Sequence, residues 1–434
     1  MKKTLKKVVP TFVFSLYYRL LALAGACFYG FPSRKMVIIG VTGTKGKTST
    51  ANFIWSCLQV GGHKTGIIST ANIRIGGKEL LNEYHMTMPG RFTIQKLLAR
   101  MVKEGCTHCV VETTSEGIQQ YRHIGVDYDI AAFTNLSPEH LPSHGGSFEK
   151  YKEMKTKMFA ALSSHKKVID GKEIEKVIIV NNDSEHAGDF LRFVADKKIT
   201  FALNNSADYL AKNVQETGAG VDFEVMHSKY QISILGKFNV YNALPAIIVS
   251  HLMNIEDSAI TRGLRDLQMI PGRMEKIDGG QNFTVIVDYA HEKVSMTNVL
   301  ETANAMKKPG TKTIILLGAE GGGRDKAKRP IMGELAATMA DYVVVTNVDP
   351  YEDDPGEILE DIAIAAEKFG KMRNKNLFVI EDRRDGIQKA LSLAEAGDIV
   401  LITGKGAEQS MIIGGKSIPW DDREVVREEL KMVQ

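Results

Sequence analysis

Short apolar runs alternate with longer amphipathic segments along most of this chain. From residue 36 onward, runs rich in β-branched residues predict strands at 37–41, 65–70, 107–113, 129–134 and 177–181. Continuous apolar strands separated by helical segments, such as 48–60, are typical of a parallel sheet covered on both faces. We therefore expect an α/β fold in which the first large domain has a mostly parallel sheet.

The second half of the chain repeats this alternation after a region of different character. Short alternating runs between residues 198 and 235 predict a small antiparallel patch, followed by helices at 239–253 and 257–267. Strands are then expected at 285–288, 313–317, 342–346, 377–380 and 399–403. We interpret 270–273 as a hinge between a domain at 36–270 and a C-terminal Rossmann-like α/β domain at 271–434, although no G-x-G-x-x-G fingerprint follows the first strand of the latter.

One motif between the first predicted strand and helix carries clear chemistry. Residues 40–48 read Gly-Val-Thr-Gly-Thr-Lys-Gly-Lys-Thr, a glycine-rich turn that opens a helix. Backbone N–H groups and a helix N-terminus attract phosphate, Lys47 would pair with the β- and γ-phosphates, and the Thr48 hydroxyl would hold Mg²⁺. The spacing departs from the strict G-x-x-x-x-G-K-[ST] pattern by one position. The predicted ATP-binding segment comprises Gly43, Thr44, Lys45, Gly46, Lys47, Thr48 and Ser49.

The first 35 residues differ in composition from the rest. They include seven basic residues and no acidic one, and 11–31 is almost wholly apolar or aromatic apart from Arg19. Export behind a secretory signal would separate the phosphate-binding loop from ATP, and Arg19 disfavours a spanning helix. Two interpretations stay open: a basic helix on the inner face of the membrane, or a helix packed on the body of the protein.

Composition narrows the remaining classes. A length of 434 residues predicts two or three domains, and a net charge of +3 gives no reason to invoke nucleic acid. The four cysteines include one C-x-x-C pair, Cys106 and Cys109, without a second pair to complete a zinc site. Because this pair begins an apolar strand, we expect core thiols in a reducing compartment, the cytoplasm.

Other candidate residues are weak when taken singly. Glu112 ends a strand, where a carboxylate could reach Mg²⁺, or it could neighbour a helix cap. His140 and His144 flank a Pro/Ser-rich loop and could be surface histidines. Lys155 is one of four lysines in a charged helix, for which a solvated face is the ordinary interpretation. Their order along the chain is more informative than any one of them.

That order resembles the Mur ligase family from about residue 36 to 420. The matching segments are Val-Glu-Thr-Thr-Ser (111–115), Phe-Thr-Asn-Leu-Ser-Pro-Glu-His-Leu (133–141), Tyr-Lys-Glu-Met-Lys-Thr-Lys-Met-Phe (151–159), Gly-Lys-Phe-Asn-Val-Tyr-Asn-Ala (236–243), Pro-Gly-Arg-Met-Glu (271–275), Val-Asp-Tyr-Ala-His (287–291), Asp-Lys-Ala-Lys-Arg-Pro (325–330) and Thr-Gly-Lys-Gly-Ala-Glu (403–408). The resemblance is greatest to the MurE type, which adds the third amino acid to UDP-N-acetylmuramoyl-dipeptide. It implies an ATP-dependent amide ligase of peptidoglycan synthesis that works as a monomer through an acyl phosphate.

The resemblance also assigns roles to individual residues. Lys47 would contact the transferred phosphate, Thr48 and Glu112 would hold one Mg²⁺, and His140 a second. Lys155 matches a lysine that CO₂ carbamylates into a metal-bridging anion. The remaining assignments are Asn239 and Asn242 at adenine, Arg273 at the phosphates after domain closure, Asp288 at the ribose, Thr87, Thr114 and Arg122 at the muramoyl peptide, and Arg324, Asp349, Gly404 and Glu408 at the incoming amino acid.

Departures from the family pattern concern the substrates and the metal site. Only 39 residues precede Gly40, where the family carries a UDP-binding domain, so we expect uridine recognition to be missing or delegated. The family's Asp-Asn-Pro-Arg, whose arginine binds the far carboxylate of diaminopimelate, is Val-Asp-Pro-Tyr at 348–351. Lysine, ornithine or another amino acid is therefore open. Glu116 and Glu139 replace the family's usual His and Asp.

Two other classes of function remain as alternatives. One is another Mur-fold ligase: a MurT-like amidating subunit, which would need a zinc-binding cysteine cluster and a glutaminase partner, or an enzyme like cyanophycin synthetase or folylpolyglutamate synthase. The other is a non-catalytic, membrane-associated nucleotide-binding regulator. Such a regulator needs only the phosphate-binding loop, so the presence of Lys155, His140, Arg273, Asp288 and Glu408 argues against it.

Overall fold

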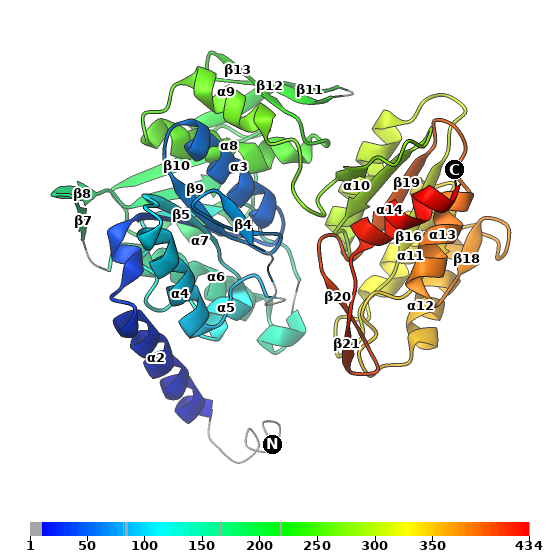
Figure 1. The fold of residues 1–434 in the computed structure, drawn as a ribbon, viewed down its shortest axis with the longest axis horizontal. Helices are drawn as coiled ribbons and strands as arrows, with labels where there is room; N and C mark the ends of the chain where they lie inside the picture. Colours follow the sequence, from blue (N-terminus) through cyan, green and yellow to red (C-terminus); the bar gives the residue numbers. More distant parts are fainter. Residues whose placement is uncertain are drawn as a thin grey trace. The chain divides into compact units, whose positions relative to one another are not determined.

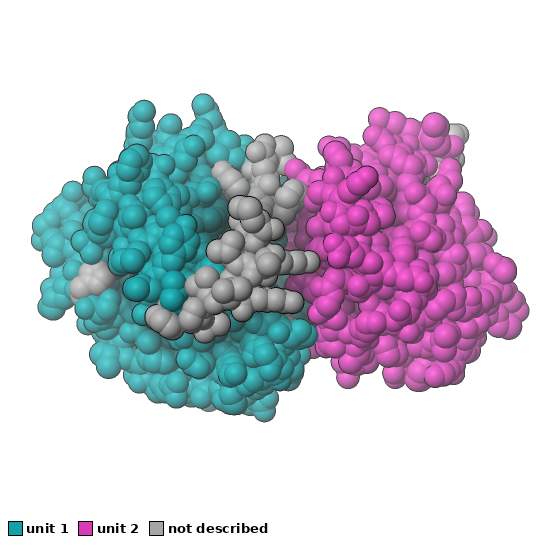
Figure 2. Space-filling model, turned by 90° about the horizontal axis from the view of Figure 1, so that it is seen from below, with its two compact units in different colours: residues 1–215, 221–233, 239–268 teal, residues 216–220, 234–238, 269–434 magenta. Residues whose placement is uncertain are grey.

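The computed structural model of the chain describes residues 11–80, 82, 86–139, 141–164, 166–217 and 219–433. The chain forms two compact units (Figure 2), one made of residues 1–215, 221–233 and 239–268 and the other of 216–220, 234–238 and 269–434. Each unit is organised around its own sheet, in agreement with the predicted α/β class.

The first unit is built on an 11-stranded sheet with the order β13-β12-β11-β10-β9-β6-β1-β5-β2-β3-β4. Central β1 is parallel to both β5 and β6, and β2 and β9 continue the parallel arrangement outward. All residues of β1, β5, β6 and β9 are buried, as continuous apolar strands require. The strands are β1 (Val37–Thr42), β2 (Thr65–Ile68), β3 (Ile73–Ile75), β4 (Lys78–Leu80), β5 (His108–Glu112), β6 (Ile130–Phe133), β9 (Val177–Asn181), β10 (Lys197–Ala202), β11 (Tyr209–Thr217), β12 (Gly220–Val225) and β13 (Ser228–Ile232), with a separate hairpin of β7 (Lys167–Ile169) and β8 (Lys172–Ile174).

Helices cover both faces of this sheet (Figure 1), with α4, α5 and α6 on one side and α3, α8 and α9 on the other. On the first side, Leu98 of α4 and Phe159 of α6 join strand residues such as Ile38 in one buried core. The helices of the unit are α2 (Thr11–Phe28), α3 (Lys47–Val60), α4 (Arg91–Lys103), α5 (Ser115–Gln119), α6 (Phe148–Leu162), α7 (Ala187–Leu191), α8 (Phe238–Leu252) and α9 (Asp257–Asp266), with 3-10 turns η1 (Pro32–Lys35) and η2 (Leu141–His144). Cys106 and Cys109 lie in the same core, as predicted.

The expectation of a separate antiparallel patch between 198 and 235 is wrong in part. β10 is parallel to β9 and β11, so it extends the parallel part of the main sheet, whereas β12 and β13 form an antiparallel pair. Alternation of buried and exposed residues, as in β12, reports that one face is covered. It does not report the direction of the neighbouring strand, and therefore the sequence pattern could not place β10.

Helix α2 packs against the first unit along one side only. It lies beside α4 (Figure 1), and the contact uses the small residues Ala22, Gly25 and Ala26, which are buried. Gly25 approaches α4 closely, because an added Cβ would lie 3.4 Å from the Arg91 carbonyl oxygen. Across the described residues, we find no helix with both the length and the apolar character needed to cross a bilayer.

The second unit has a six-stranded sheet with the order β14-β15-β19-β16-β17-β18. Its strands are parallel except for β14, which pairs antiparallel with β15 at one edge. The strands are β14 (Glu275–Ile277), β15 (Thr284–Asp288), β16 (Thr313–Leu317), β17 (Tyr342–Val345), β18 (Leu377–Val379) and β19 (Ile399–Thr403), with a hairpin of β20 (Ser410–Ile413) and β21 (Lys416–Pro419). The helices are α10 (Lys293–Met306), α11 (Lys328–Met339), α12 (Pro355–Lys368), α13 (Arg383–Ser392) and α14 (Asp422–Val433).

Candidate active site

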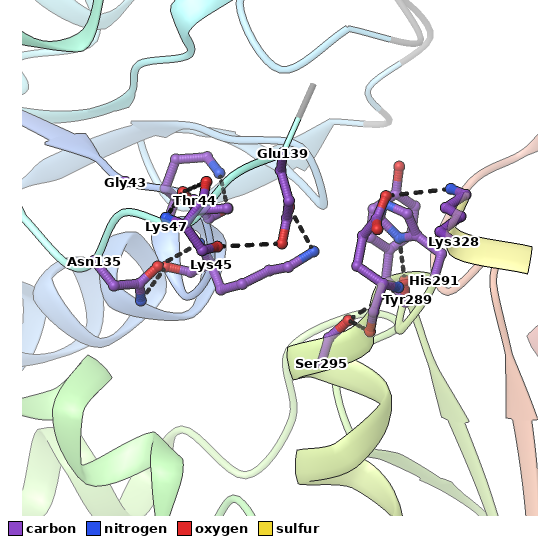
Figure 3. A network of polar contacts seen from close by, with 12 residues as sticks. Gly43, Thr44, Lys45, Lys47, Asn135, Glu139, Tyr289, His291, Ser295 and Lys328 are labelled. Atoms are coloured by element: carbon purple, nitrogen blue, oxygen red, sulfur yellow. Dashed lines mark hydrogen bonds and ion pairs between the residues drawn. The ribbon is translucent and has the colours of Figure 1, made fainter. Parts of the chain in front are cut away.

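The glycine-rich segment forms a tight loop between β1 and α3. Gly43 and Gly46 have φ angles of 151° and 81°. No side chain fits at either glycine, because an added Cβ would lie 2.0 Å from Thr134 Oγ1 or 2.1 Å from Asn242 Oδ1. The loop is fixed from outside by Asn135, whose carbonyl and side-chain oxygens accept from the Thr44 and Lys45 amides at 2.8 Å each (Figure 3). This geometry leaves the α3 N-terminus as an anion-binding site.

Lys47 lies at the first position of α3, where its ammonium group is held over the loop. Its Nζ donates to the Thr44 carbonyl oxygen at 2.8 Å (Figure 3). The neighbouring Lys45 points elsewhere and pairs with Glu139 at 3.0 Å. The two lysines of the motif therefore differ: one is anchored on the loop backbone, and the other is engaged by a carboxylate.

An oxygen cluster next to the loop has the chemistry of a magnesium site. Glu112 ends β5 and is buried, and its Oε2 accepts from the Thr48 hydroxyl at 3.0 Å and from the Thr70 amide at 2.8 Å. Hydroxyl and carboxylate oxygens are the donors that Mg²⁺ prefers. The described residues contain no cluster of three or more His, Cys, Asp or Glu that could hold a metal by itself. His140 lies outside the described residues.

Lys155 is buried beside the same loop. Only 2% of it is exposed, its Nζ donates to the Gly43 carbonyl oxygen at 2.7 Å, and it lies 4.6 Å from the centroid of the Tyr151 ring. Burial, and then the charge of Lys47, holds the pKa of the Lys155 ammonium well below its usual value, although nearby carboxylates oppose this. A buried lysine in this state carries a neutral, nucleophilic amine far more often than an exposed one.

The residues predicted to contact adenine lie in α8, beside the phosphate loop, and those predicted at the peptide are held by hydrogen bonds in the segments that follow β4 and β5. In α8, Asn242 donates to Asn239 Oδ1 at 2.8 Å, and Asn242 is the side chain that closes on Gly46. Thr87 is hydrogen-bonded to Thr70 at 2.8 Å, and Thr114 caps α5 by accepting from the Gly117 amide at 3.1 Å. The Arg122 guanidinium donates to the carbonyl oxygen of Met88, next to Thr87.

Glu116 of α5 and His144 of η2 each contact a serine hydroxyl of the other element. Glu116 Oε1 accepts from Ser143 at 2.7 Å, and His144 Nε2 lies 3.1 Å from the Ser115 hydroxyl. Burial lowers the pKa of His144. His144 is therefore a buried partner of α5, and it differs from the surface histidine considered from sequence.

In the second unit, the predicted residues gather where parallel strands end. Asp288 ends β15 and accepts from the Met274 and Ala290 amides at 2.7 Å each. It therefore holds the residue before β14 and the residues after β15 close together. Arg273 lies 4.4 Å from the centroid of the Tyr289 ring. Because β16, β17 and β19 end at the same edge, Glu320, Asp349 and Gly404 follow there, as expected for a site on an open α/β sheet.

Lys405 organises this edge, a role that sequence reasoning did not assign. Its buried Nζ donates to Asp349 Oδ2 at 2.8 Å and to Glu408 Oε2 at 2.6 Å, while the Tyr289 hydroxyl donates to the other Glu408 oxygen at 3.0 Å. Burial lowers the pKa of Lys405, but the two carboxylates outweigh it and raise the value. Burial raises the pKa of Glu408. The signal in the sequence was a lysine between two glycines directly after a buried strand.

Arg324 and Lys328 complete the edge from the loop and helix that follow β16. Arg324 Nε is 3.7 Å from Glu320, and the buried Lys328 pairs with Glu292 at 3.2 Å and with Glu320 at 3.6 Å. Figure 3 shows Lys328 beside His291, whose Nδ1 is 2.7 Å from the Tyr289 carbonyl oxygen. Tyr351, at the position of the family's arginine, packs on Gly322, where an added Cβ would lie 2.7 Å from Tyr351 Cγ.

Two protein-family profiles and several curated relatives match this chain. The Mur ligase middle domain profile matches residues 41–250, and the profile of the Mur ligase glutamate ligase domain matches 272–406. A UDP-N-acetylmuramoyl-L-alanyl-D-glutamate–2,6-diaminopimelate ligase of Bacillus cereus is 36% identical over 429 residues, covering 97% of this chain and 84% of the relative. A UDP-N-acetylmuramyl-tripeptide synthetase of a Roseiflexus species is 36% identical over 421 residues, covering 94% and 81%.

Solved structures show the same fold. The structure of a UDP-N-acetylmuramoyl-L-alanyl-D-glutamate–2,6-diaminopimelate ligase superposes with a TM-score of 0.61 at 30% identity, covering 92% of this chain and 79% of that one. A Mycobacterium tuberculosis folylpolyglutamate synthase gives a TM-score of 0.70 at 17% identity, covering 96% and 95%. At this identity the second likeness concerns the fold alone.

Proposed function

The chain belongs to the Mur ligase family, and on that premise we propose that it joins an amino acid to a muramoyl peptide, at the expense of ATP, in peptidoglycan synthesis. It is an ATP-dependent acid–amino acid ligase of the MurE type. The observation that carries the proposal is the built phosphate loop, with Lys47, Thr48 and Glu112 in contact with it or with one another. The reaction belongs in the cytoplasm, where ATP is available.

The chemistry has two steps that need cationic groups. The carboxylate of the acceptor peptide attacks the γ-phosphate of ATP, giving an acyl phosphate and ADP. The amine of the incoming amino acid then attacks the acyl carbon, phosphate leaves, and the amine loses a proton. Both steps bring anions together, so electrostatic stabilisation dominates catalysis. Lys47 is the residue that we assign to the transferred phosphate, and Arg273 is the second cation that we assign to the phosphates.

We assign the metal ligands to Thr48, Glu112, His140 and Lys155. Thr48 and Glu112 would hold one Mg²⁺, and His140 and a carbamate on Lys155 would serve a second. The donor set fits, because Thr48 and Glu112 already share a hydrogen bond at 3.0 Å and because the Lys155 amine is buried 2.7 Å from the loop carbonyl. Bound Mg²⁺ would neutralise charge that develops on the phosphates.

The remaining assignments concern the nucleotide and the two acyl-transfer partners. Asn239 and Asn242 would contact adenine and Asp288 the ribose; Thr87, Thr114 and Arg122 would hold the muramoyl peptide; and Arg324, Asp349, Gly404 and Glu408 would bind the incoming amino acid. Tyr351 offers no guanidinium to a far carboxylate. An amino acid other than diaminopimelate, such as lysine or ornithine, is therefore the substrate that we favour.

A product assay tests the proposed function directly. We expect pure full-length protein, given Mg²⁺-ATP, a muramoyl dipeptide on either a UDP or a lipid carrier, and single amino acids, to form a product heavier by one amino acid less one water. One ADP should appear per product, because the acyl phosphate consumes one ATP. Mass spectrometry of the acceptor measures the outcome. ATP hydrolysis without any amide product, across all common amino acids, would sink the proposal.

We also propose that the enzyme works at the inner face of the cell membrane. The side of α2 away from the body is apolar and exposed, at Val13, Leu16, Tyr17, Leu20, Leu23 and Phe28, which we call the α2 stripe. The sequence before it contains Lys2, Lys3, Lys6 and Lys7 and no acidic residue. An apolar stripe with basic residues suits an anionic membrane surface. One side of α2 packs on the first unit, and the exposed α2 stripe is the side that we propose for the membrane.

Vesicle sedimentation tests this placement. We expect the full chain to sediment with phosphatidylglycerol-containing vesicles and the Leu16→Ser/Leu20→Ser variant to lose most of that binding, about tenfold or more, because two large apolar groups leave the interface. Val194→Ser is the matched control, since Val194 is 76% exposed but lies outside α2. Equal sedimentation of all three proteins would show that α2 is not the membrane contact.

A further inference from the structure

Three arginines and two tyrosines gather where α2 meets α4 and the turn after α5. Arg91 Cζ lies 3.9 Å from the centroid of the Tyr18 ring, and Arg19 Cζ lies 4.9 Å from the centroid of the Tyr121 ring. Arg122 follows Tyr121 in the chain, and both Arg91 and Arg122 donate to Gln120. α2 therefore supplies both an aromatic support for Arg91 and the cation Arg19.

These arginines have spare hydrogen-bonding capacity. Within the described parts of the chain, none of the three forms an ion pair with a carboxylate, and the buried Nε atoms of Arg91 and Arg122 have no acceptor. Burial, followed by the charge of Arg91, lowers the pKa of Arg122. The charge of Glu116 opposes this decrease, but Glu116 forms no ion pair with Arg122 within the described residues. An anion between Arg91 and Arg122 would therefore still be favoured, and the arginine fork matches phosphate oxygens.

The cluster adjoins the segments assigned to the muramoyl peptide. The Arg122 guanidinium donates to the Met88 carbonyl oxygen, one residue after Thr87, and its backbone amide donates to Gly117 in α5 at 2.9 Å. A muramoyl group held by Thr87 and Thr114 would therefore present whatever is linked to its sugar close to Arg91 and Arg122. In activated muramoyl precursors that link is a diphosphate.

The α2 stripe begins on the same helix that carries Tyr18 and Arg19. Tyr17 and Leu20, the residues on either side of them in sequence, are 56% and 57% exposed. At the C-terminal end of α2, the ring centroid of Phe28 lies 6.4 Å from that of Phe92 in α4. Phe92 is also exposed, so the apolar surface continues from α2 onto α4. The apolar α2 stripe thus adjoins Arg19 on the same helix and Arg91 packed on Tyr18, as an acyl chain adjoins its diphosphate head group in a lipid.

We propose that the acceptor is a muramoyl peptide carried on a membrane-embedded lipid diphosphate, with the diphosphate bound by Arg19, Arg91 and Arg122 and the α2 stripe lying in the lipid interface. This inference rests on the proposed ligase function, which it deepens by naming the carrier. A UDP-linked acceptor offers the same diphosphate but no lipid. The cation cluster alone would accept either carrier, and the α2 stripe is what selects the lipid.

The experiment compares the two carriers on the full chain. The muramoyl dipeptide is offered as its UDP derivative in solution, and as a polyprenyl diphosphate in phosphatidylglycerol/phosphatidylcholine vesicles, with the amino acid identified by the product assay. We expect kcat/KM to be at least tenfold higher for the lipid carrier. Leu16→Ser/Leu20→Ser should abolish that preference while leaving turnover of the UDP carrier within twofold, and Val194→Ser should leave both unchanged.

The arginine cluster is tested by a separate variant. Arg91→Ala should raise KM for the lipid-linked acceptor at least tenfold with kcat nearly unchanged, because the reacting groups lie elsewhere, and Arg91→Lys should recover part of the loss. Equal or better use of the UDP carrier, or a preference that survives the change in the α2 stripe, would overturn the inference and leave the ligase function standing. Absence of product from both carriers would instead overturn the proposed function.

Discussion

Replacing Lys155 by alanine is expected to lower kcat for ligation by about 10³-fold or more, because the proposed carbamate would help to hold the Mg²⁺ that neutralises phosphate charge, a contribution of several kcal/mol. The change removes a side chain that is 2% exposed and that donates to the Gly43 carbonyl oxygen, so no other described lysine can take its place. A short carboxylic acid such as acetate should restore part of the activity by occupying the space of the carbamate. Initial rates of amide formation, with and without the acid, measure both effects.

Lys150 gives the matched control for this prediction. It belongs to the same helix, α6, but is exposed, so Lys150→Ala removes the same type of side chain from α6 without touching the phosphate loop. We expect its rates to stay within twofold of the parent and to be indifferent to the acid. Full turnover by Lys155→Ala would show that the carbamate assignment is wrong, whatever the acid does.

Helical spacing explains how far the sequence could locate Lys155. Taken singly, a lysine in a charged helix reads as part of a solvated face, yet Lys155 follows Tyr151 by four residues and precedes Met158 and Phe159 by three and four, and all three are buried. The lysine therefore occupies a core position of α6. What the pattern could not predict is the partner, since the Gly43 carbonyl oxygen comes from a loop more than a hundred residues earlier.

The strands likewise show that the sequence pattern predicts local structure but not contacts between distant segments. Buried apolar runs predicted β1, β2, β5, β6 and β9 of the first sheet and β15 to β19 of the second to within about two residues, because burial on both faces leaves a continuous apolar signature. The order of those strands in the sheet, and with it the meeting of Asp349, Lys405 and Glu408, depends on crossovers between distant segments. Tyr289 and Lys405 therefore stood in the quoted motifs, but the sequence could not show that both are hydrogen-bonded to Glu408.

Small residues made the placement of α2 hard to predict. Its packed side uses Ala22, Gly25 and Ala26, which differ little in hydrophobicity from the residues around them. A helix that is apolar almost all round gives no periodic signal to say which side packs and which side stays exposed. The sequence therefore left two interpretations open. The structure shows that one side of α2 packs on the first unit, and contact of the other side with a membrane stays a proposal.

Replacing Lys47 by alanine is expected to lower kcat/KM for ATP by about 10³-fold, since the cation closest to the transferred phosphate is lost. The fold should survive, because Gly43 and Gly46 set the loop backbone and Asn135 holds the Thr44 and Lys45 amides independently of the Lys47 side chain. ATP-dependent amide formation under varied ATP gives kcat and KM, and calorimetric titration with ADP reports nucleotide binding.

Lys45 is the informative comparison, because it belongs to the same loop and carries the same charge. Its ammonium group already pairs with Glu139 at 3.0 Å, so Lys45→Ala removes a cation whose field is partly neutralised before ATP binds. We expect a loss of about tenfold for Lys45→Ala, two orders of magnitude less than for Lys47→Ala. If the two variants lost activity equally, the loop would act through its total charge, and the assignment of Lys47 to the transferred phosphate would be wrong.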